Sequence, residues 1–268
     1  MERRRISSAA NPRLKAALRL RDRRDRERSG LTIVDGARET LRALAGGATP
    51  REGFVSVASC ADDECRAALA QLEQAGVPVH DLGPAAFARL AYGDRLDGII
   101  AVAEIPGHAL GDLSLPPEPL IGVIEGVEKP GNLGAILRTA DGAGVDAVVV
   151  ADPGTDLFNP NVIRASLGTV FSVPVAVASS GDVIAWLREQ GVRIIAARVQ
   201  ASVDYTQADY RGAVAIALGS EARGLSDPWA ELAHVSVHLP MNGVADSLNV
   251  SATAAVLFYE AVRQRRAG

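Results

Sequence analysis

The sequence predicts an α/β protein with two domains, and three observations indicate this. Short apolar runs typical of strands alternate with helical patterns along most of the chain. A stretch rich in Pro and Gly follows the first of these series and has no sustained period. The apolar runs after it are nearly continuous, as in parallel strands covered on both faces. We therefore expect an N-terminal domain at residues 1–105, a linker at 106–117 and a C-terminal parallel-sheet domain at 118–268.

The N-terminal domain is expected to be a compact unit of alternating helices and strands. Its first helix is rich in Arg and begins near Asn11-Pro12, because Pro is tolerated at a first helical position. Gly46-Gly47 and Gly76 end two of the later helices. The predicted helices are 12–28, 36–45, 62–75 and 84–91, and the predicted strands are 31–34, 54–58, 77–82 and 98–104.

The C-terminal domain shows the stronger strand signals. Its last helix is apolar almost all round until Arg263, so it must be buried on several faces, which suggests a homodimer seam as well as a contact with the sheet. Asp246 or Ser247 is expected to cap this helix. The predicted strands are 120–124, 147–151, 192–197, 214–218 and 235–239, and the predicted helices are 131–143, 159–167, 181–190 and 247–264.

The composition is that of an ordinary globular protein, with 48% hydrophobic and 22% charged residues. The chain has no run of eighteen apolar residues and no apolar signal core at its start, so we expect a cytoplasmic protein without a membrane span. Cys60 and Cys65 lie in C-A-D-D-E-C, without further cysteines or nearby histidines. We expect two reduced thiols and no metal site.

Basic residues are concentrated near the N-terminus, although the net charge of −4 argues against a nucleic-acid partner. Residues 1–105 carry 17 Lys and Arg against 15 Asp and Glu, whereas residues 106–268 carry 11 against 17. The excess lies between Arg3 and Arg28. Such a cluster can neutralise several phosphates, which favours contact with RNA. The alternative is a solvated helix whose Arg side chains pair with its own Asp and Glu.

Three segments of the C-terminal domain place polar residues after predicted strands, at the edge where open α/β sheets bind ligands. In the first, 125–138, Asn132 lies at a helix start, where backbone N–H groups can hold an anion, and Arg138 follows within two turns. The second, 218–225, holds an acid and an arginine between two glycines, and the third, 239–251, is a Gly loop leading into the last helix. Taken singly, these residues also fit caps, turns or surface ion pairs. The P-loop and GxGxxG fingerprints are absent.

Together the three segments resemble, in order and spacing, the three motifs of the SpoU-type (TrmH-like) RNA 2′-O-ribose methyltransferases of the SPOUT superfamily. The matching stretches are N-L-G-A-I-L-R at 132–138, L-G-S-E-A-R-G-L at 218–225 and L-P-M-x-G-x-x-D-S-L-N-V-S at 239–251. The stretch N-V-I-R-A-S-L-G-T-V-F at 161–171 is similar to a family segment between motifs one and two. More weakly, S-x-x-N-P-R-L-K and I-V-D-G-A-R-E-T resemble the family's substrate-binding domain of ribosomal-protein-L30 type.

The resemblance implies S-adenosyl-L-methionine (SAM) as cofactor, a homodimer and a trefoil knot in the C-terminal domain. Such a knot is an exception to the general rule that protein chains are not knotted. The implied cofactor-binding residues are Ala197, Leu218, Gly219, Leu239, Met241, Ser247 and Leu248. The implied catalytic residues are Arg138, Asn132, Glu221, Ser247 and Asn249. The candidate RNA-binding residues are Arg13, Lys15, Arg19, Arg23, Lys129 and Arg164.

Two of these residues leave alternatives open. The family's favoured base is the motif-one arginine, here Arg138, acting across the dimer. Because arginine is normally too basic to lose a proton, the alternative is an electrostatic role that lowers the pKa of the substrate hydroxyl. The family commonly has Asp-Pro ahead of the motif-one Asn, whereas this chain has Lys129-Pro130. Lys129 either replaces an acidic neighbour of the active site or adds a phosphate contact.

The expected function is SAM-dependent methyl transfer to a ribose 2′-hydroxyl of RNA. An L30-type recognition domain favours ribosomal RNA of the large subunit over tRNA. The 2′-hydroxyl itself distinguishes RNA from DNA. A tRNA 2′-O-methyltransferase, a drug-resistance methyltransferase, a non-catalytic RNA-binding module and another nucleotide-dependent α/β enzyme are the alternatives.

Overall fold

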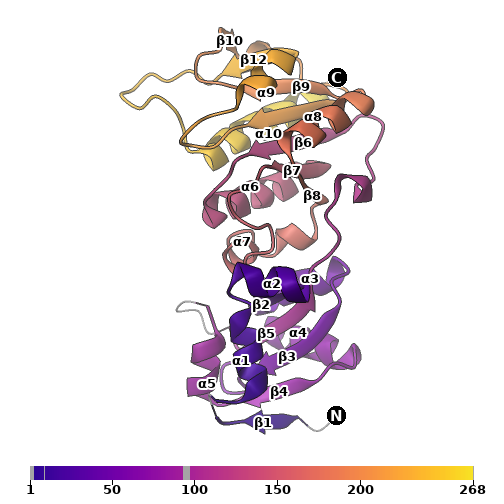
Figure 1. Cartoon of the computed structure of the whole chain (residues 1–268), viewed down its shortest axis with the longest axis vertical. Helices are drawn as coiled ribbons and strands as arrows, with labels where there is room; N and C mark the ends of the chain where they lie inside the picture. Colours follow the sequence, from indigo (N-terminus) through magenta and orange to yellow (C-terminus); the bar gives the residue numbers. More distant parts are fainter. Residues whose placement is uncertain (1–2, 9, 93–96, 268) are drawn as a thin grey trace. The chain divides into compact units, whose positions relative to one another are not determined.

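The structure, a computed structural model, describes residues 3–8, 10–92 and 97–267 of the chain. It contains two compact units, each with its own sheet (Figure 1). The N-terminal unit comprises Met1–Pro106 together with Phe158–Ser172, and the C-terminal unit comprises Gly107–Leu157 together with Val173–Gly268. The order of elements along the chain does not indicate that Phe158–Ser172 packs with the N-terminal unit.

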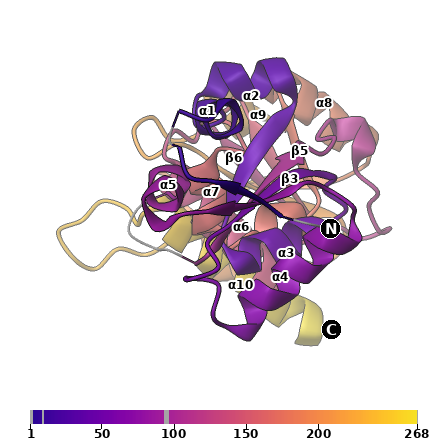
Figure 2. The same ribbon diagram turned by 90° about the horizontal axis from the view of Figure 1, so that it is seen from below.

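The N-terminal unit is a mixed five-stranded sheet in the order β1-β4-β3-β5-β2. Strand β5 pairs antiparallel with β2 and β3, and the other pairs are parallel. Helices α1 and α5 cover one face, where Leu14, Phe54 and Phe87 are buried, and α3 and α4 cover the other (Figure 2). The strands are β1 Arg4–Ile6, β2 Leu31–Asp35, β3 Pro50–Val55, β4 Val79–Leu82 and β5 Ile99–Glu104; the helices are α1 Pro12–Arg19, α2 Arg23–Ser29, α3 Ala37–Ala45, α4 Asp63–Gln74 and α5 Pro84–Leu90.

The single helix predicted over 12–28 is wrong, because the structure divides it into α1 and α2. The start is as expected: Asn11 caps α1, and Pro12 is its first residue. The chain then leaves the helix after Arg19, and the Asp22 side chain caps α2 by accepting a hydrogen bond from Arg24 N at 2.8 Å. Aspartate competes for backbone N–H groups in this way, so a run of charged residues can contain a helix boundary that its composition hides.

The cysteines form a disulfide, so the expectation of reduced thiols is wrong. Asp62 caps α4 by accepting a hydrogen bond from Cys65 N at 2.7 Å, and the preceding turn carries Cys60 back beside it. The two Cα atoms are 5.4 Å apart, which is within the range that a disulfide spans. The short acidic stretch between them is therefore a closed turn at the start of α4.

The segment Phe158–Ser172 contains helix α7 (Pro160–Ala165) and a short 3-10 turn at Thr169–Phe171. Its backbone is held by N-terminal side chains: Thr32 Oγ1 donates to Phe158 O at 2.8 Å, and an Arg42 guanidinium nitrogen donates to Leu167 O at 2.6 Å. A Cβ added at Gly46 would lie 2.0 Å from Phe171 O, so only glycine permits this approach. The segment is thus an integral part of the N-terminal unit.

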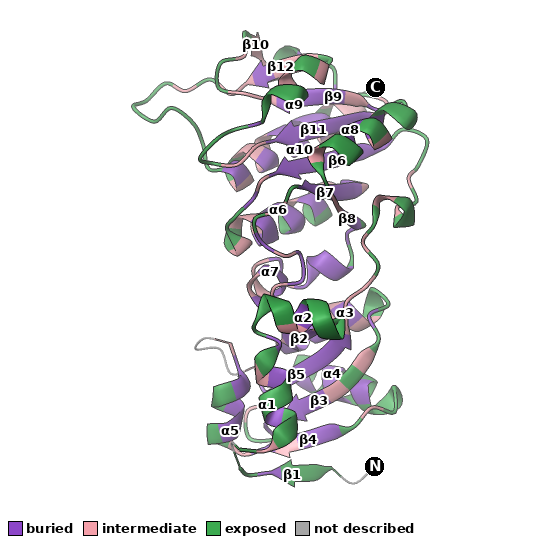
Figure 3. Ribbon diagram, in the orientation of Figure 1, coloured by how far each residue is buried: buried purple, intermediate pink, exposed green. Residues whose placement is uncertain are grey.

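The C-terminal unit is a seven-stranded, all-parallel sheet in the order β10-β12-β9-β11-β6-β7-β8. Helices α8 and α9 pack on one face, and α6 and α10 on the other, so the central strands are buried on both sides (Figure 3). The strands are β6 Leu120–Glu125, β7 Ala147–Ala151, β8 Val175–Ala178, β9 Arg193–Ala197, β10 Val203–Asp204, β11 Val214–Leu218 and β12 Val235–His238; the helices are α6 Pro130–Ala143, α8 Ser180–Glu189, α9 Asp227–Leu232 and α10 Val250–Ala267.

The predicted two-domain α/β class and parallel C-terminal sheet are confirmed. The stretch interpreted as a linker carries a 3-10 turn at Leu110–Asp112, and Leu110, Leu113 and Leu115 pack against the core of the C-terminal unit. Within the described residues, none of the helices combines the length and apolar character that a membrane crossing requires.

Candidate functional site

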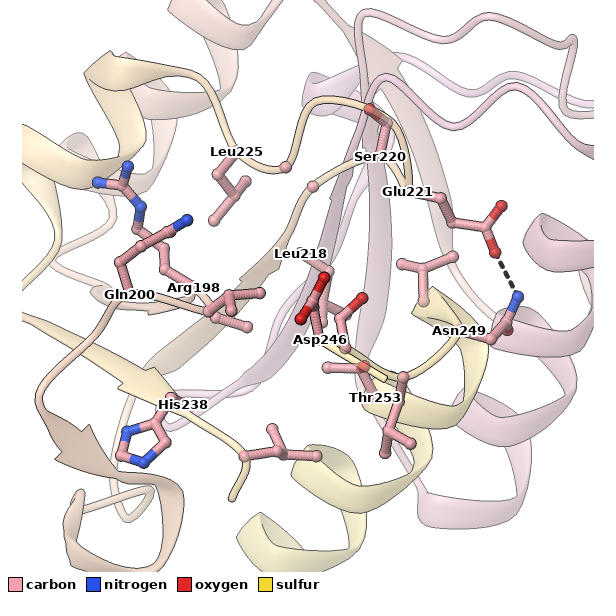
Figure 4. A pocket seen from close by; sticks show the side chains of 18 of the residues that line it. Arg198, Gln200, Leu218, Ser220, Glu221, Leu225, His238, Asp246, Asn249 and Thr253 are labelled. Carbon is pink, nitrogen blue, oxygen red and sulfur yellow. Dashed lines mark hydrogen bonds between the residues drawn. The ribbon is translucent and has the colours of Figure 1, made fainter. Parts of the chain in front are cut away.

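A pocket of about 660 Å³ opens at the carboxyl ends of β9, β11 and β12. This is the edge at which open α/β sheets bind ligands. Figure 4 shows Arg198, Gln200 and His238 on one side of the pocket, and Glu221 and Asn249 on the opposite side. The lining comes from the segments that follow the three strands and from the start of α10, and comprises Ala197–Gln200, Leu218–Leu225, Val237–Leu239, Met241, Asp246–Val250 and Thr253.

The structure brings all of the predicted cofactor-binding positions to this pocket. They are Ala197, Leu218, Gly219, Leu239, Met241, Ser247 and Leu248. Two predicted catalytic residues, Glu221 and Asn249, line it as well. Sequence reasoning did not single out Arg198, Gln200, His238 or Thr253, although the position of the first two just after a strand end is a signal that could have found them.

One wall of the pocket is the loop Leu218–Leu225, and its shape depends on glycine. A Cβ added at Gly219 would lie 2.0 Å from the carbonyl carbon of Gly224. Gly224 has a φ of 67°, and its N–H donates to Ser220 O at 2.9 Å. The backbone therefore doubles back on itself so closely that no side chain fits at position 219.

Glu221 is the centre of a polar cluster beside the pocket. Lys129 Nζ lies 2.8 Å from its Oε2, and Asn249 Nδ2 donates to its Oε1 (Figure 4). Asn249 Nδ2 also lies 3.3 Å from Asn132 Oδ1. The hydrogen bond from Lys129, more than any other interaction, lowers the pKa of Glu221. The cluster thus holds an ionised carboxylate between motifs one, two and three.

Asn249 is also the cap of the last helix, so the expectation that Asp246 or Ser247 would cap it is wrong. Helix α10 begins at Val250, and Asn249 Oδ1 accepts hydrogen bonds from Ser251 N at 3.0 Å and Ser251 Oγ at 2.6 Å. Asp246 and Ser247 instead lie in the exposed loop that lines the pocket. Capping directs the amide nitrogen of Asn249 toward Glu221.

Arg138 lies apart from this cluster within the chain. It is exposed on α6, outside the pocket lining, and makes no hydrogen bond or ion pair with a described residue. Asn132, on the same helix, does reach the Glu221 cluster. The structure therefore brings together Asn132, Glu221 and Asn249, with Ser247 at the pocket, and leaves Arg138 facing outward.

The candidate RNA-binding residues fall into three groups. Arg13, Lys15, Arg19 and Arg23 are exposed on α1 and α2. Arg13 is paired with Glu52 at 2.8 Å and Arg23 with Glu27 at 2.7 Å. Arg164 is half-buried on α7 in the N-terminal unit, and Lys129 is held by Glu221. Arg26, a member of the same basic cluster, is buried and donates to Leu20 O, so it is not a free cation.

Comparison with known proteins gives matches over both parts of the chain. Residues 119–259 match the model of the SpoU rRNA methylase family, and residues 11–101 match that of the MRM3-like substrate binding domain. The 23S rRNA (guanosine-2′-O-)-methyltransferase RlmB of Bordetella pertussis is 36% identical over 215 residues, which covers 78% of this chain and 87% of that protein.

Solved structures agree with these matches. A crystal structure of an RNA 2′-O ribose methyltransferase is 41% identical, with a TM-score of 0.87 over 97% of this chain and 98% of the other. The SpoU methyltransferase AviRb from Streptomyces viridochromogenes, in complex with the cofactor AdoMet (SAM), is 27% identical, with a TM-score of 0.88 over 96% and 99% of the two chains. With its motifs, its fold and these matches in agreement, the chain belongs to the SpoU rRNA methylase family.

Proposed function

We propose that this protein transfers a methyl group from SAM to a ribose 2′-hydroxyl of ribosomal RNA, in the large subunit. The observation that carries the proposal is the pocket at the ends of β9, β11 and β12, with the ionised Glu221 at its side. The RlmB relative acts on 23S rRNA, and the AviRb structure contains AdoMet. We also propose that the protein acts in the cytoplasm, on the ground that its proposed substrate is ribosomal RNA.

The residues present fit SAM. A pocket of about 660 Å³ is in the range that holds nucleoside-sized ligands. Gly219, where no Cβ can be accommodated, lets the loop Leu218–Leu225 fold tightly enough to form one wall of the pocket. Leu218, Leu239, Met241 and Leu248 would contact its apolar parts, with Ala197 beside the adenine. When bound, SAM supplies a methyl group on a sulfonium, which is electrophilic.

The chain's own residues must then bind and align the ribose. The carboxylate of Glu221, held by Asn249 and close to Asn132, provides hydrogen-bond acceptors beside the pocket, and Ser247 completes the polar surroundings. Orienting the hydroxyl toward the methyl group supplies much of the acceleration. A hydroxyl also needs its proton removed or its developing negative charge stabilised. Arg138 is suited to the second task, because a guanidinium keeps its charge.

Arg138 acts across a homodimer in this proposal. It is exposed on α6 and does not line its own pocket, so a second subunit is needed to bring it to a reacting ribose. The neighbouring helix α10 leaves Ala252, Val256 and Tyr259 incompletely covered, and Tyr259 is 52% exposed. This spacing puts the three side chains on one helix face, which suits a subunit seam.

We also propose that the C-terminal unit carries the trefoil knot of the resemblance. The order of its strands is compatible with a knot: β11 lies between β9 and β6, while the chain goes on to β12 outside β9 and then returns to α10 beside α6. A chain that leaves and re-enters a sheet in this way can pass through one of its own loops.

The N-terminal domain, residues 1–105, is the RNA-recognition part of the proposal. Residues 118–268 form the methyltransferase part, except for the segment Phe158–Ser172, which packs with the N-terminal unit. The exposed Arg13, Lys15, Arg19 and Arg23 would contact phosphates, and Lys129 and Arg164 would add contacts of the same kind. The match to a substrate-binding domain over residues 11–101 supports this division.

The test is transfer of labelled methyl groups from SAM to total ribosomal RNA and, separately, to tRNA. Wild type is expected to label ribosomal RNA and to yield an alkali-resistant dinucleotide, because a 2′-O-methyl group blocks alkaline cleavage. Arg138→Ala should abolish transfer, whereas the matched control Arg188→Ala, an exposed arginine on α8, should not. Labelling of tRNA alone would show that the substrate is tRNA and not ribosomal RNA. SAM binding without any transfer would favour a non-catalytic RNA-binding module.

A further inference from the structure

Glu125, the last residue of β6, is a buried carboxylate to which the proposed function gives no part. Glu125 is 8% exposed. Four donors reach its two oxygens: Ser180 Oγ at 2.8 Å, Ser226 Oγ at 2.6 Å and Trp229 Nε1 at 2.9 Å to Oε1, and Ser226 N at 2.7 Å to Oε2. A buried charge is costly unless hydrogen bonds compensate it, and here they do.

The donors tie Glu125 to the wall of the cofactor pocket. Ser226 directly follows the loop Leu218–Leu225, and Trp229 is a fully buried residue of α9, the helix that this loop enters. The other end of the loop is already fixed to β6, because Leu218 pairs with Ile124 in the sheet. Both ends of the loop are therefore fixed to the end of β6. Leu218 is held there through the sheet, and Ser226 is held through the Glu125 side chain.

A carboxylate is specifically required by this arrangement. Ser226 N and Trp229 Nε1 can only donate, and they reach different oxygens of Glu125. A glutamine of the same shape would offer one oxygen and one NH₂ group, so one of these N–H groups would face another donor. A buried donor without an acceptor is costly, and the structure can relieve the cost by moving the loop.

We propose that Glu125 is a positioning residue for the cofactor: it holds the loop Leu218–Leu225 in the shape that binds SAM, without touching SAM itself. This inference rests on the proposed function only in taking the pocket as a SAM site. It follows that loss of the carboxylate weakens SAM binding and raises the KM for SAM, while the kcat at saturating SAM changes little.

The experiment compares Glu125→Gln with Glu189→Gln, an exposed glutamate at the end of α8, by calorimetric titration with SAM. We expect SAM to bind Glu125→Gln about tenfold more weakly or worse, as for loss of a buried hydrogen-bond partner. Glu189→Gln should bind like wild type. The indole N–H resonance of Trp229, assigned with Trp229→Phe since the chain has two tryptophans, should shift in Glu125→Gln and report the broken hydrogen bond.

A second variant keeps the test valid if Glu125→Gln does not fold. Ser226→Ala removes one donor but leaves the backbone N–H, and it should weaken SAM binding about threefold. Unchanged SAM affinity together with a shifted Trp229 resonance would overturn the proposal, and so would a lower kcat with an unchanged KM. Wild type that binds SAM but methylates no RNA would refute the proposed function alone, whereas wild type that binds no SAM would refute both.

Discussion

Lys129 and Glu221 form an ion pair whose partners have unequal surroundings. The Lys129 side chain is 73% exposed and that of Glu221 is 30% exposed. Such an exposed pair contributes little to folding stability. Its effect falls on protonation: the hydrogen bond from Lys129 lowers the pKa of Glu221, so this carboxylate stays ionised to lower pH than an isolated glutamate.

Replacing Lys129 is expected to raise the pKa of Glu221. In Lys129→Met the largest cause of the lowered pKa is gone, so protonation of Glu221 moves to higher pH, toward its ordinary range. The acid limb of methyl transfer should move in the same direction, because the ionised form is the one that the cluster uses. The measurement is a carboxyl carbon-13 titration of Glu-labelled protein between about pH 3 and pH 6, with the signal assigned by Glu221→Gln.

The matched control is Lys15→Met, since Lys15 is the only other lysine of the chain. Replacing Lys15 should leave the pKa of Glu221 unchanged. If Lys129→Met also left the pKa of Glu221 unchanged, the hydrogen bonds of Asn132 and Asn249 would be sufficient to keep Glu221 ionised. Lys129 would then be available to contact an RNA phosphate.

At single positions the motifs anticipated which residues gather at the pocket, but not how they pair. Asn132, Glu221 and Asn249 were expected in one site and lie in one cluster. The pairing of Lys129 with Glu221 was not expected, because it joins residues 92 positions apart and leaves no local pattern. The four hydrogen bonds on Glu125 are of the same kind, since they join three separate segments of the chain.

Among the elements, the loop Leu218–Leu225 has the strictest backbone requirement at the site. Gly219→Ala is expected to open this loop, because its Cβ would lie 2.0 Å from the carbonyl carbon of Gly224 and a backbone atom must move. SAM affinity should fall by more than about tenfold, because overpacking the loop costs about a few kcal/mol. Calorimetric titration measures this.

Gly181→Ala in α8 is the control, because an added Cβ there meets only Ser179 Oγ at 3.9 Å. It should bind SAM like wild type. Equal SAM affinity for Gly219→Ala would show that the loop relaxes without disturbing the pocket, and the cofactor assignment of Gly219 would then fail.

Element prediction succeeded where burial gives a strong pattern. Strands β7 and β11 are apolar throughout, β6 carries no polar side chain before its final Glu125, and each was placed to within a residue. Strand β1 was missed because two of its three residues are exposed arginines and only Ile6 is buried. Three other elements were missed because they are short: β8 has four residues, β10 two and α9 six. The boundary between α1 and α2 was missed because it lies within a run of charged residues.

For the whole molecule, the proposed dimer makes a quantitative prediction. If Arg138 serves the partner's site, a heterodimer of Arg138→Ala and Glu221→Gln subunits has one site with neither defect and one with both. Co-expression with two affinity tags, followed by random pairing, should restore about a quarter of wild-type methyl transfer, since half of the dimers are mixed and each has one intact site.

Each variant expressed alone supplies the baseline and should be inactive. A co-expressed preparation that stays at this baseline would mean that Arg138 and Glu221 act in the same subunit, because each site of the heterodimer would then carry one defect. Gel filtration of the purified heterodimer separates that result from a simple failure to associate.

The grouping of Phe158–Ser172 with the N-terminal unit could not be predicted from periodicity. The segment follows β7 of the C-terminal sheet in the sequence, and its helical pattern is ordinary. What places it is a set of long-range contacts, such as Thr32 with the Phe158 carbonyl and Gly46 against Phe171. Local patterns specify which face of a helix is buried but not which sheet buries it.

That segment has a consequence for exchanging recognition domains between family members. A chimera joined once, within residues 106–117, would set Phe158–Ser172 against the N-terminal sheet of another parent and disturb the packing of Phe158, Ile163 and Phe171, which are buried here. A soluble hybrid must therefore import two stretches of sequence, the N-terminal domain and this insert, from the same parent. In evolution too, the two stretches are expected to diverge together.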